Sequence, residues 1–238
     1  MLLKNKVAAI TGGGRGIGRS IAMQFAREGA DVVLIARTTR QINQVALDVQ
    51  NLGCKSLAVT ADISNESEIS DTFTQILNHF ARVDILVNNA GVEFKNPFVE
   101  MSMDDWDQTM NINARGTVLC TKAVLPGMLK RKTGNIINIA SGAGLRGLPG
   151  SAAYGASKAA IIALSFALAD EIRDQGIRVN VICPGLIKTD MVDNYTLLGK
   201  SSNVLLPDDV AGTALFIASE LSGKITGQVF SVRNSNRW

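Results

Sequence analysis

A tyrosine and a lysine stand four residues apart in the segment AAYGASKAA, at Tyr154 and Lys158. Side chains at positions i and i+4 share one face of a helix, so these two can stay close together. A free tyrosine has a pKa of about 10, and a neighbouring ammonium stabilises the phenolate and lowers that pKa toward neutral pH. Acid–base catalysis is most efficient in that range. The pair is therefore a candidate for moving a proton, with an incidental pair on a helix surface as the alternative.

Ser141 is the next candidate for chemistry, because it ends the apolar run GNIINIAS 13 residues before Tyr154. Such a run predicts a strand. In a parallel sheet the ligand crevice opens beyond the carboxyl ends of the strands, so the Ser141 hydroxyl is expected to face a ligand.

The segment ITGGGRGIG at 10–18 joins the first expected strand to the first expected helix. Its key glycines, Gly12, Gly16 and Gly18, have the spacing G-x-x-x-G-x-G rather than the G-x-G-x-x-G fingerprint. Glycines permit a tight turn and close approach to a phosphate, and the N-terminus of the next helix attracts negative charge. We interpret the segment as a nucleotide phosphate site; a plain glycine-rich turn is the alternative.

The residues after the second expected strand bear on the choice of nucleotide. An acidic residue there would accept a hydrogen bond from a ribose 2′-hydroxyl, but Ala36, Arg37 and Thr38 include no acid. Arg37 can pair with a 2′-phosphate, and Arg15 of the glycine loop could reach the same group. These residues favour NADP(H) over NAD(H), unless both arginines are simply solvated.

These residues must be positioned by a regular alternation of short apolar runs and longer amphipathic ones. The alternation predicts an α/β fold, with parallel strands, right-handed crossovers and helices on both faces of the sheet. No linker rich in Pro, Gly or Ser divides residues 1–238, which we read as one domain. Asp62 and Ser64 offer capping oxygens before the third helix. The expected strands are 6–11, 31–36, 55–61, 83–91, 134–141, 177–185 and 227–232, and the expected helices are 16–29, 40–52, 66–80, 103–112, 116–131, 153–174 and 207–220.

Composition argues against several classes of protein. Hydrophobic residues are 46% of the chain and charged residues 19%, which suits a folded domain with a sizeable core. The net charge of +3 comes without a basic block, so nucleic-acid binding is not expected. Cys54, Cys120, Cys183 and the single His79 make no metal-binding pattern. Reduced thiols, an N-terminus unlike a leader and no unbroken apolar run of about 18 residues predict a cytoplasmic protein.

Six motifs in order carry a more specific signal. They are TGGGRGIG at 11–18, NNAG at 88–91, NINARG at 111–116, IAS ending at Ser141, YGASK at 154–158 and CPGLIKT at 183–189. On these motifs the chain resembles the short-chain dehydrogenase/reductase family, in its single-domain branch. The resemblance implies a Rossmann-type doubly wound parallel sheet of about seven strands in three αβα layers. Within the family the chain is most like 3-oxoacyl-[acyl-carrier-protein] reductases.

The resemblance also implies a role for each matching residue. Tyr154 is the general acid in reduction, Ser141 holds the substrate oxygen, Lys158 contacts the nicotinamide ribose and stabilises the phenolate, and Asn113 holds a water that relays protons to Lys158. For Asn88 of the NNAG motif, the alternative is a strand-end turn that braces the sheet. The residues expected to bind the cofactor are Gly12, Gly14, Arg15, Gly16, Ile17, Gly18, Arg37, Asp62, Ile63, Asn89, Ala90, Gly91, Tyr154, Lys158, Pro184, Gly185, Ile187 and Thr189.

Two segments depart from the family pattern. Residues 190–206 are several fewer than relatives usually carry there, which predicts a reduced substrate lid. The chain ends VRNSNRW instead of in a V-D-G-G-like turn, which puts the usual tetramer interface in doubt. Pairing of helices 103–131 and 153–174 across a two-fold axis is still expected, giving a homodimer or homotetramer.

The function expected from these residues is NADPH-dependent reduction of a ketone, such as a 3-oxoacyl thioester, to a secondary alcohol. The alternative within the family is an NAD(P)-dependent dehydrogenase of a sugar, steroid or small alcohol. A non-catalytic nucleotide sensor or scaffold is a rival from another class, but its signature would be lost catalytic residues. Lys130, Arg131 and Lys132 could meet an acidic acyl carrier protein, or could be a solvated helix end.

Overall fold

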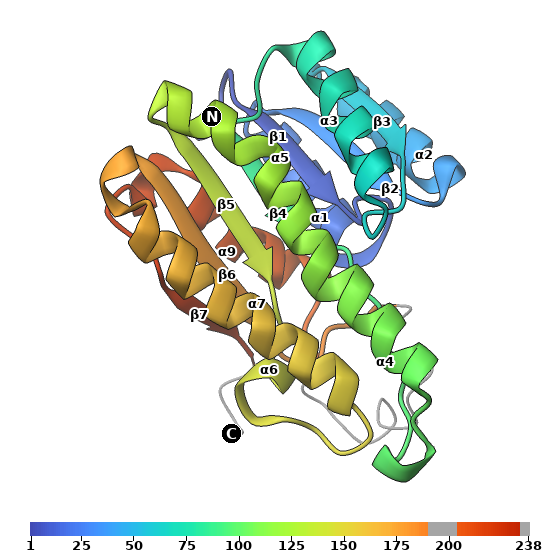
Figure 1. Ribbon diagram of the computed structural model, residues 1–238. Coiled ribbons are helices and arrows are strands. Elements are labelled where there is room, and N and C mark those ends of the chain that lie inside the picture. The colour runs from blue at the N-terminus through green and yellow to red at the C-terminus, as the bar shows by residue number, and fades with distance from the viewer. Residues whose placement is uncertain (190–203, 234–238) are drawn as a thin grey trace.

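Seven parallel strands form the middle layer of the structure, a computed structural model that describes residues 1–189 and 204–233 (Figure 1). The strand order is β3-β2-β1-β4-β5-β6-β7, and every neighbouring pair is parallel. The predicted doubly wound sheet is confirmed, and its direction of winding reverses between β1 and β4. The strands are Val7–Thr11 (β1), Asp31–Ala36 (β2), Ser56–Thr60 (β3), Ile85–Asn88 (β4), Gly134–Ile139 (β5), Ile177–Pro184 (β6) and Val229–Val232 (β7).

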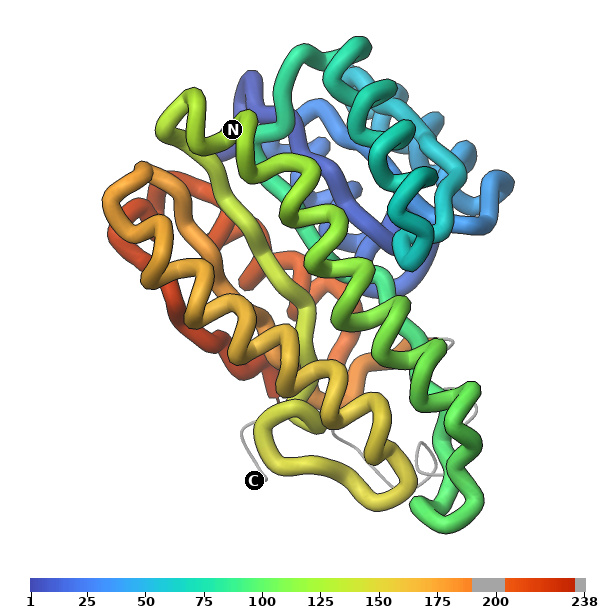
Figure 2. Tube along the Cα trace, viewed as in Figure 1, coloured from blue at the N-terminus to red at the C-terminus, as the bar shows by residue number. Residues whose placement is uncertain are grey.

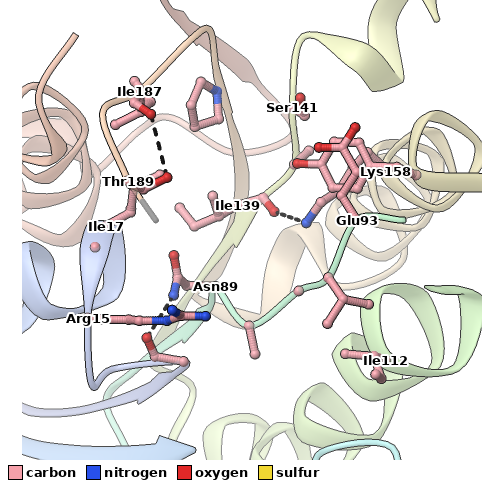
Figure 3. Close-up of a pocket in the computed structure, with 18 of the residues that line it drawn as sticks. Arg15, Ile17, Asn89, Glu93, Ile112, Ile139, Ser141, Lys158, Ile187 and Thr189 are labelled. Carbon is pink, nitrogen blue, oxygen red and sulfur yellow. Dashed lines mark hydrogen bonds between the residues drawn. The ribbon is translucent and has the colours of Figure 1, made fainter. Parts of the chain in front are cut away.

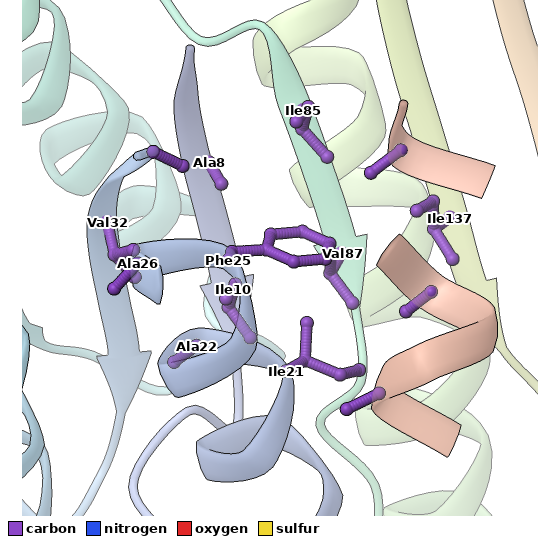
Figure 4. Packing of buried hydrophobic residues seen from close by; sticks show 14 of the residues in the cluster. Ala8, Ile10, Ile21, Ala22, Phe25, Ala26, Val32, Ile85, Val87 and Ile137 are labelled. Atoms are coloured by element: carbon purple, nitrogen blue, oxygen red, sulfur yellow. The ribbon is translucent and has the colours of Figure 1, made fainter. Parts of the chain in front are cut away.

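Helices cover both faces of the sheet, which is why β1 and β4 are buried along their whole length. On one face α1, α2 and α9 pack, and Phe25 and Ile21 of α1 point at Ala8 and Val87 of the sheet (Figure 4). On the other face lie α3, α5 and α7 (Figure 1). The helices are Gly16–Arg27 (α1), Thr39–Asn51 (α2), Glu66–Phe80 (α3), Met103–Thr109 (α4), Gly116–Arg131 (α5), Ala143–Arg146 (α6), Ala152–Glu171 (α7) and Pro207–Ala218 (α9), with short 3-10 turns at Phe98–Glu100 (η1), Arg173–Gln175 (η3) and Glu220–Ser222 (η5).

The helices expected over 103–112 and 116–131 are joined rather than separate. A π-helical turn, Met110–Arg115 (η2), connects α4 to α5, and Asn113 is buried within it. A π-turn widens the helix by one residue per turn and often marks a functional position. The sequence pattern did not predict this turn, because a π-helical turn and a break between two helices interrupt the spacing of apolar residues in the same way.

The cap of α3 also differs from the expectation. Asn65, not Asp62 or Ser64, precedes the helix, and its side-chain oxygen accepts hydrogen bonds from the N–H groups of Ser67 and Glu68. Asp62 instead accepts from the N–H and hydroxyl of Ser64, at 2.9 and 2.7 Å. The helix begins at Glu66, so only Asn65 has the position from which a side chain can reach the first turn.

Within residues 1–189 and 204–233, α7 alone is long and apolar enough to cross a membrane. Half of that apolar stretch is buried inside the fold, where Ile161, Ile162 and Ala169 face the sheet. Core helices pass the same test, so α7 is weak support for a membrane span.

Candidate active site

A cavity of about 480 Å³ opens beyond the carboxyl ends of the central strands, on both sides of the β1–β4 reversal (Figure 3). Parallel α/β sheets place ligand sites at such a reversal. The cavity runs from the glycine loop to Tyr154, and Gly18 and Asn113 lie behind its wall. The predicted residues that line it are Gly12, Gly14, Arg15, Gly16, Ile17, Arg37, Asp62, Ile63, Asn89, Ala90, Gly91, Ser141, Tyr154, Lys158, Pro184, Gly185, Ile187 and Thr189.

The glycine loop is shaped so that side chains would fill it. Gly12 and Gly16 have φ of +65° and +52°, a region that favours glycine. A Cβ atom at Gly18 would lie 2.3 Å from the Gly12 oxygen, so this glycine lets α1 pack against the loop. The loop is thus an open cradle at the start of α1, which fits the phosphates of a nucleotide.

The NNAG motif ties the glycine loop to β4. Thr11 Oγ1 accepts hydrogen bonds from the N–H groups of Asn89 and Ala90, both at 3.0 Å. The Asn89 amide donates to the main-chain oxygens of Thr11 and Gly12, at 3.0 and 3.2 Å. Asn89 therefore shapes the cradle.

Asn88 has the bracing role that was the alternative for this motif. Its amide nitrogen donates to Thr121 Oγ1 on α5 at 3.1 Å and to Asn138 Oδ1 on β5 at 2.8 Å. Asn88 is buried and does not line the cavity, so it holds neighbouring elements together rather than facing a ligand.

Tyr154 and Lys158 stand one turn apart at the start of α7. Lys158 is only 3% exposed, and its Nζ lies 5.6 Å from the centre of the Tyr154 ring. That Nζ donates a hydrogen bond to the Ile139 oxygen at the end of β5, over 2.9 Å (Figure 3). The Ser141 hydroxyl accepts a hydrogen bond from the Ala143 N–H at 3.1 Å and lies close enough to the Tyr154 phenol to affect its pKa. The three residues that the motifs single out therefore meet at one end of the cavity.

Burial dominates the protonation of this pair. It raises the pKa of Tyr154 to about 12; the hydrogen bond with Ser141 opposes that rise, and the charges of Glu93 and Cys183 add to it. Burial also lowers the pKa of Lys158 to about 8. Burial of the phenol acts against the expectation that Lys158 brings the pKa of Tyr154 toward neutral pH, and that expectation stays a prediction. Tyr154 is thus a neutral phenol at pH 7, the form that can donate a proton.

Asn113 connects the loop after β4 to α7 from behind the cavity. Its side-chain oxygen accepts from the Val92 N–H at 2.8 Å, and its amide nitrogen donates to the Val92 oxygen and to Ser157 Oγ, both at 2.9 Å. Ser157 in turn donates to the Tyr154 main-chain oxygen at 2.8 Å. Both N–H donors of Asn113 serve protein groups, and its role as the holder of a relay water stays a prediction.

The comparisons with known proteins agree with this geometry. A family model described as short chain dehydrogenase matches residues 6–197. The chain belongs to the short-chain dehydrogenase/reductase family. Family membership makes it an oxidoreductase that uses a nicotinamide nucleotide, and the open glycine cradle fits such a group.

Two curated relatives and one solved structure illustrate the family. The chain is 40% identical to the (2S)-[(R)-hydroxy(phenyl)methyl]succinyl-CoA dehydrogenase subunit BbsD of Thauera aromatica, over 98% of this chain and 96% of that one. It is 38% identical to a 3-oxoacyl-[acyl-carrier-protein] reductase of Synechocystis sp., over 97% and 96%. The crystal structure of levodione reductase superposes with a TM-score of 0.93 at 28% identity, covering 97% of each chain.

One charged residue of the site, Glu93, was not predicted from the sequence. Glu93 lines the cavity and acts electrostatically on both Tyr154 and Lys158. Its carboxylate accepts a hydrogen bond from the Ser151 hydroxyl at 2.6 Å. The available signal was its position, two residues after NNAG on a loop that leaves the carboxyl end of a strand.

The basic segment at 130–132 lies away from the cavity. Lys130 and Arg131 end α5, just before β5 begins, whereas Ser141 follows the other end of β5 (Figure 1). Arg131 also turns inward and donates to the Val83 oxygen at 2.7 Å. This placement favours the alternative of a helix end for 130–132, and the contact of this segment with a carrier stays a prediction.

The segments expected to depart from the family pattern are described only in part. Residues 190–203 of the reduced lid and 234–238 of the tail lie outside the described residues. Near the end of the lid segment, within its described part, Leu205 forms an isolated parallel bridge with Ile187, which lines the cavity. The expected lid itself stays a prediction.

Proposed function

We propose that this enzyme reduces a ketone to a secondary alcohol, with Tyr154 as proton donor and NADPH as reductant. The observation that carries the proposal is the meeting of Tyr154, Ser141 and Lys158 at the end of a cavity that begins at the glycine cradle. A substrate carbonyl oxygen beside Ser141 and Tyr154 would accept hydrogen bonds from both hydroxyls, which polarises the carbonyl.

Proton transfer in this proposal runs from the protein to the substrate. NADPH, when bound, supplies the hydride that the carbonyl carbon receives. Tyr154 gives its phenolic proton to the carbonyl oxygen, so the product is a neutral alcohol and the tyrosine becomes a phenolate. The Lys158 ammonium stabilises that phenolate across the short distance between them. Ser141 keeps the oxygen in line with Tyr154 throughout.

NADPH rather than NADH is proposed because of the charges at the adenosine end of the cavity. Arg15 and Arg37 both line this part of the cavity. The side chain of Arg37 is exposed, and its Nη1 lies 3.8 Å from an oxygen of the Asp62 carboxylate. An exposed guanidinium held near the cavity suits a 2′-phosphate. Asp62 and Ile63 would flank the adenine, and Ile187 and Thr189 would meet the nicotinamide end.

The names of the relatives support an acyl thioester as the substrate, joined to a carrier such as acyl carrier protein or coenzyme A. The Synechocystis relative is named for a 3-oxoacyl group on acyl carrier protein, and the Thauera relative for a coenzyme A thioester. Lys95 and Arg146, which line the open side of the same cavity, could contact an acidic carrier.

Self-association as a homodimer or homotetramer is also proposed. The outward face of α7 is apolar, and its Phe166 side chain is 43% exposed beside Ala163 and Ala167. Burying such a face against a second copy is the common solution for an apolar helix surface. Light scattering that gives the mass of one chain would contradict it. The cytoplasmic location expected from the sequence stays a prediction.

The decisive experiment measures NADPH oxidation with acyl thioesters, sugars, quinones and small ketones, using Tyr154→Phe as the control. We expect turnover of at least one ketone and a loss of about 100-fold or more in the variant, with NADPH binding retained. Full activity in Tyr154→Phe would contradict the proposed proton donor. NADPH binding without turnover of any compound would favour the sensor or scaffold instead.

A further inference from the structure

Glu93 places a carboxylate beside the reacting groups, in the part of the cavity that a substrate would fill. It lies at the same end of the cavity as Lys158 and Ser141 (Figure 3). Its charge raises the pKa of both Tyr154 and Lys158, in each case less than burial changes it, so the carboxylate is within electrostatic reach of both. Hydride and proton transfer as proposed above do not need a carboxylate there.

The structure holds Glu93 from two directions. Ser151, which is 2% exposed and directly precedes α7, donates its hydroxyl hydrogen bond to Glu93 Oε1 at 2.6 Å. The neighbouring Val92 is fixed through both its N–H and its oxygen by the buried Asn113.

The loop that carries Glu93 is fastened to the facing loop as well. The Asn96 N–H donates to the Gly150 oxygen at 3.0 Å, which joins the loop after β4 to the loop between α6 and α7 (Figure 2). Both loops extend beyond the same end of the sheet. Glu93 is therefore a half-buried side chain of the cavity wall, positioned by its neighbours.

A positioned carboxylate recognises hydrogen-bond donors. Each of its oxygens accepts more than one hydrogen bond, so a carboxylate that already has protein partners can still accept one from a ligand. A hydrogen bond to a charged group contributes more than one between neutral groups. A site built to bind a substrate hydroxyl also discriminates against an analogue that lacks it, because the bound analogue shields the carboxylate from water without giving it a partner.

We propose that Glu93 is a specificity-determining residue that accepts a hydrogen bond from a hydroxyl on the substrate, one or two carbons from the reacting ketone. The inference rests on the proposed reductase function and narrows its substrate to hydroxyl-bearing ketones, free or on a carrier. An unsubstituted 3-oxoacyl chain in its keto form has no such donor beside the carbonyl. It would therefore be a poorer substrate than a hydroxylated one.

The test compares 2-hydroxycyclohexanone with 2-methoxycyclohexanone, reduced by the NADPH-loaded enzyme. Both ketones carry oxygen on the neighbouring carbon, but only the first can donate a hydrogen bond. We expect wild type to prefer the hydroxyketone in kcat/KM by about tenfold or more. Glu93→Gln, which keeps the shape and removes the charge, should lose most of that preference, and Glu93→Ala should lose all of it.

Glu100→Gln is the matched control, because it removes an exposed acid from the same loop outside the cavity wall. It should keep the wild-type ratio. Thermal melting and NADPH titration of each variant check that the fold and the nucleotide site are intact. A ratio that stays the same in wild type, Glu93→Gln and Glu93→Ala, while the ketones are turned over, would overturn the inference and leave the reductase function standing.

A binding measurement separates the two proposals if turnover fails. Calorimetry with the protein loaded with NADP⁺ compares 1,2-cyclohexanediol with 2-methoxycyclohexanol. Tighter binding of the diol to wild type, lost in Glu93→Ala, would support the role of Glu93 even without turnover. Equal affinities of the two alcohols for wild type would count against it.

Discussion

Lys158 donates a hydrogen bond from Nζ to the main-chain oxygen of Ile139, over 2.9 Å. This bond joins the first turns of α7 to the end of β5, so the helix that carries Tyr154 is held at the edge where Ser141 follows. It also keeps the ammonium in a place where it is only 3% exposed. The cost of burying that charge leads to the first prediction.

The free energy of unfolding of wild type, relative to that of Lys158→Met, should rise between about pH 8 and pH 10. The folded protein loses the Lys158 proton at about 8, whereas an unperturbed lysine keeps it to 10.5. In this window the unfolded state binds more protons, so stability contributed by this site increases with pH, by at most about 1.4 kcal/mol per unit.

Urea denaturation of both cofactor-free proteins at several pH values measures that difference. The buried thiol of Cys120 has a raised pKa and acts in the opposite direction to the same extent in both proteins. The raised pKa of Cys183 depends on Lys158, so both proteins carry Cys183→Ala in this comparison. Two stability curves that run parallel from pH 7 to 10 would contradict the buried ammonium.

Asn113→Ala should lower both stability and activity. The change removes three hydrogen bonds and leaves the Val92 main chain and the Ser157 hydroxyl without them, which predicts a loss of about 2–5 kcal/mol. The value of kcat/KM should fall at least about tenfold, because Tyr154 and the loop after β4 lose their common support. Asn43→Ala, at an exposed position of α2, is the matched control. Equal stability of the two variants would contradict the role of Asn113 in joining the loop after β4 to α7.

Gly18→Ala should weaken NADPH binding, whereas Gly212→Ala should stabilise the protein. A Cβ at Gly18 meets the Gly12 oxygen at 2.3 Å, so α1 must move away from the loop and NADPH affinity should fall at least about tenfold. At Gly212, inside α9, nothing lies within 4 Å of the added atom. Alanine there should stabilise the protein by about 0.5–1 kcal/mol. Fluorescence titration with NADPH and thermal melting give the two readouts; unchanged affinity in Gly18→Ala would be the contrary result.

Arg37→Asp should change the preference between the two nucleotides. The KM for NADPH should rise by about 10- to 100-fold through loss of a charged hydrogen bond and gain of repulsion, while the KM for NADH changes little. Arg27→Asp, an exposed arginine in the last turn of α1, controls for the change in net charge. Equal effects of Arg37→Asp on both nucleotides would contradict the assignment of NADP(H).

Charge reversal at the open side of the cavity tests the carrier protein. The double variant Lys95→Glu with Arg146→Glu should raise the KM for a 3-oxoacyl group on acyl carrier protein by several-fold more than that for a free ketone, since it removes attraction to an acidic partner. Lys130→Glu, at the opposite edge of the sheet, should leave both unchanged. If Lys130→Glu had the larger effect on the carrier-linked substrate, docking beside the cavity would be wrong.

The sequence predicted those parts of the fold and site that rest on local patterns. Alternating apolar runs were enough for a parallel sheet, and the glycine loop, Ser141 and the Tyr154–Lys158 pair each lie within one short motif. Asn65 shows the limit of such patterns, because three polar residues within four positions can all cap a helix and only the helix start decides between them.

The remaining features depend on contacts between distant segments. Glu93 meets Ser151 across 58 positions of the chain, and no local pattern reports that contact. The pKa of Tyr154 depends on how much water the folded cavity excludes. The spacing of Tyr154 and Lys158 in the sequence therefore predicted that the two side chains are neighbours, but it could not predict that burial raises the pKa of the tyrosine. The placement of the basic segment at 130–132 away from the cavity likewise could not be predicted from its charges.

The order of the strands has a consequence for the synthesis of this protein on the ribosome. β1 lies between β2 and β4, so the glycine cradle can form once the first 91 residues have emerged. Its other wall comes from residues after 139, and Thr189 approaches Gly16 from still further along the chain. A nascent chain thus carries half a nucleotide site while residues 92–189 are being added, and the cofactor can contact the complete site only after Thr189 has been made.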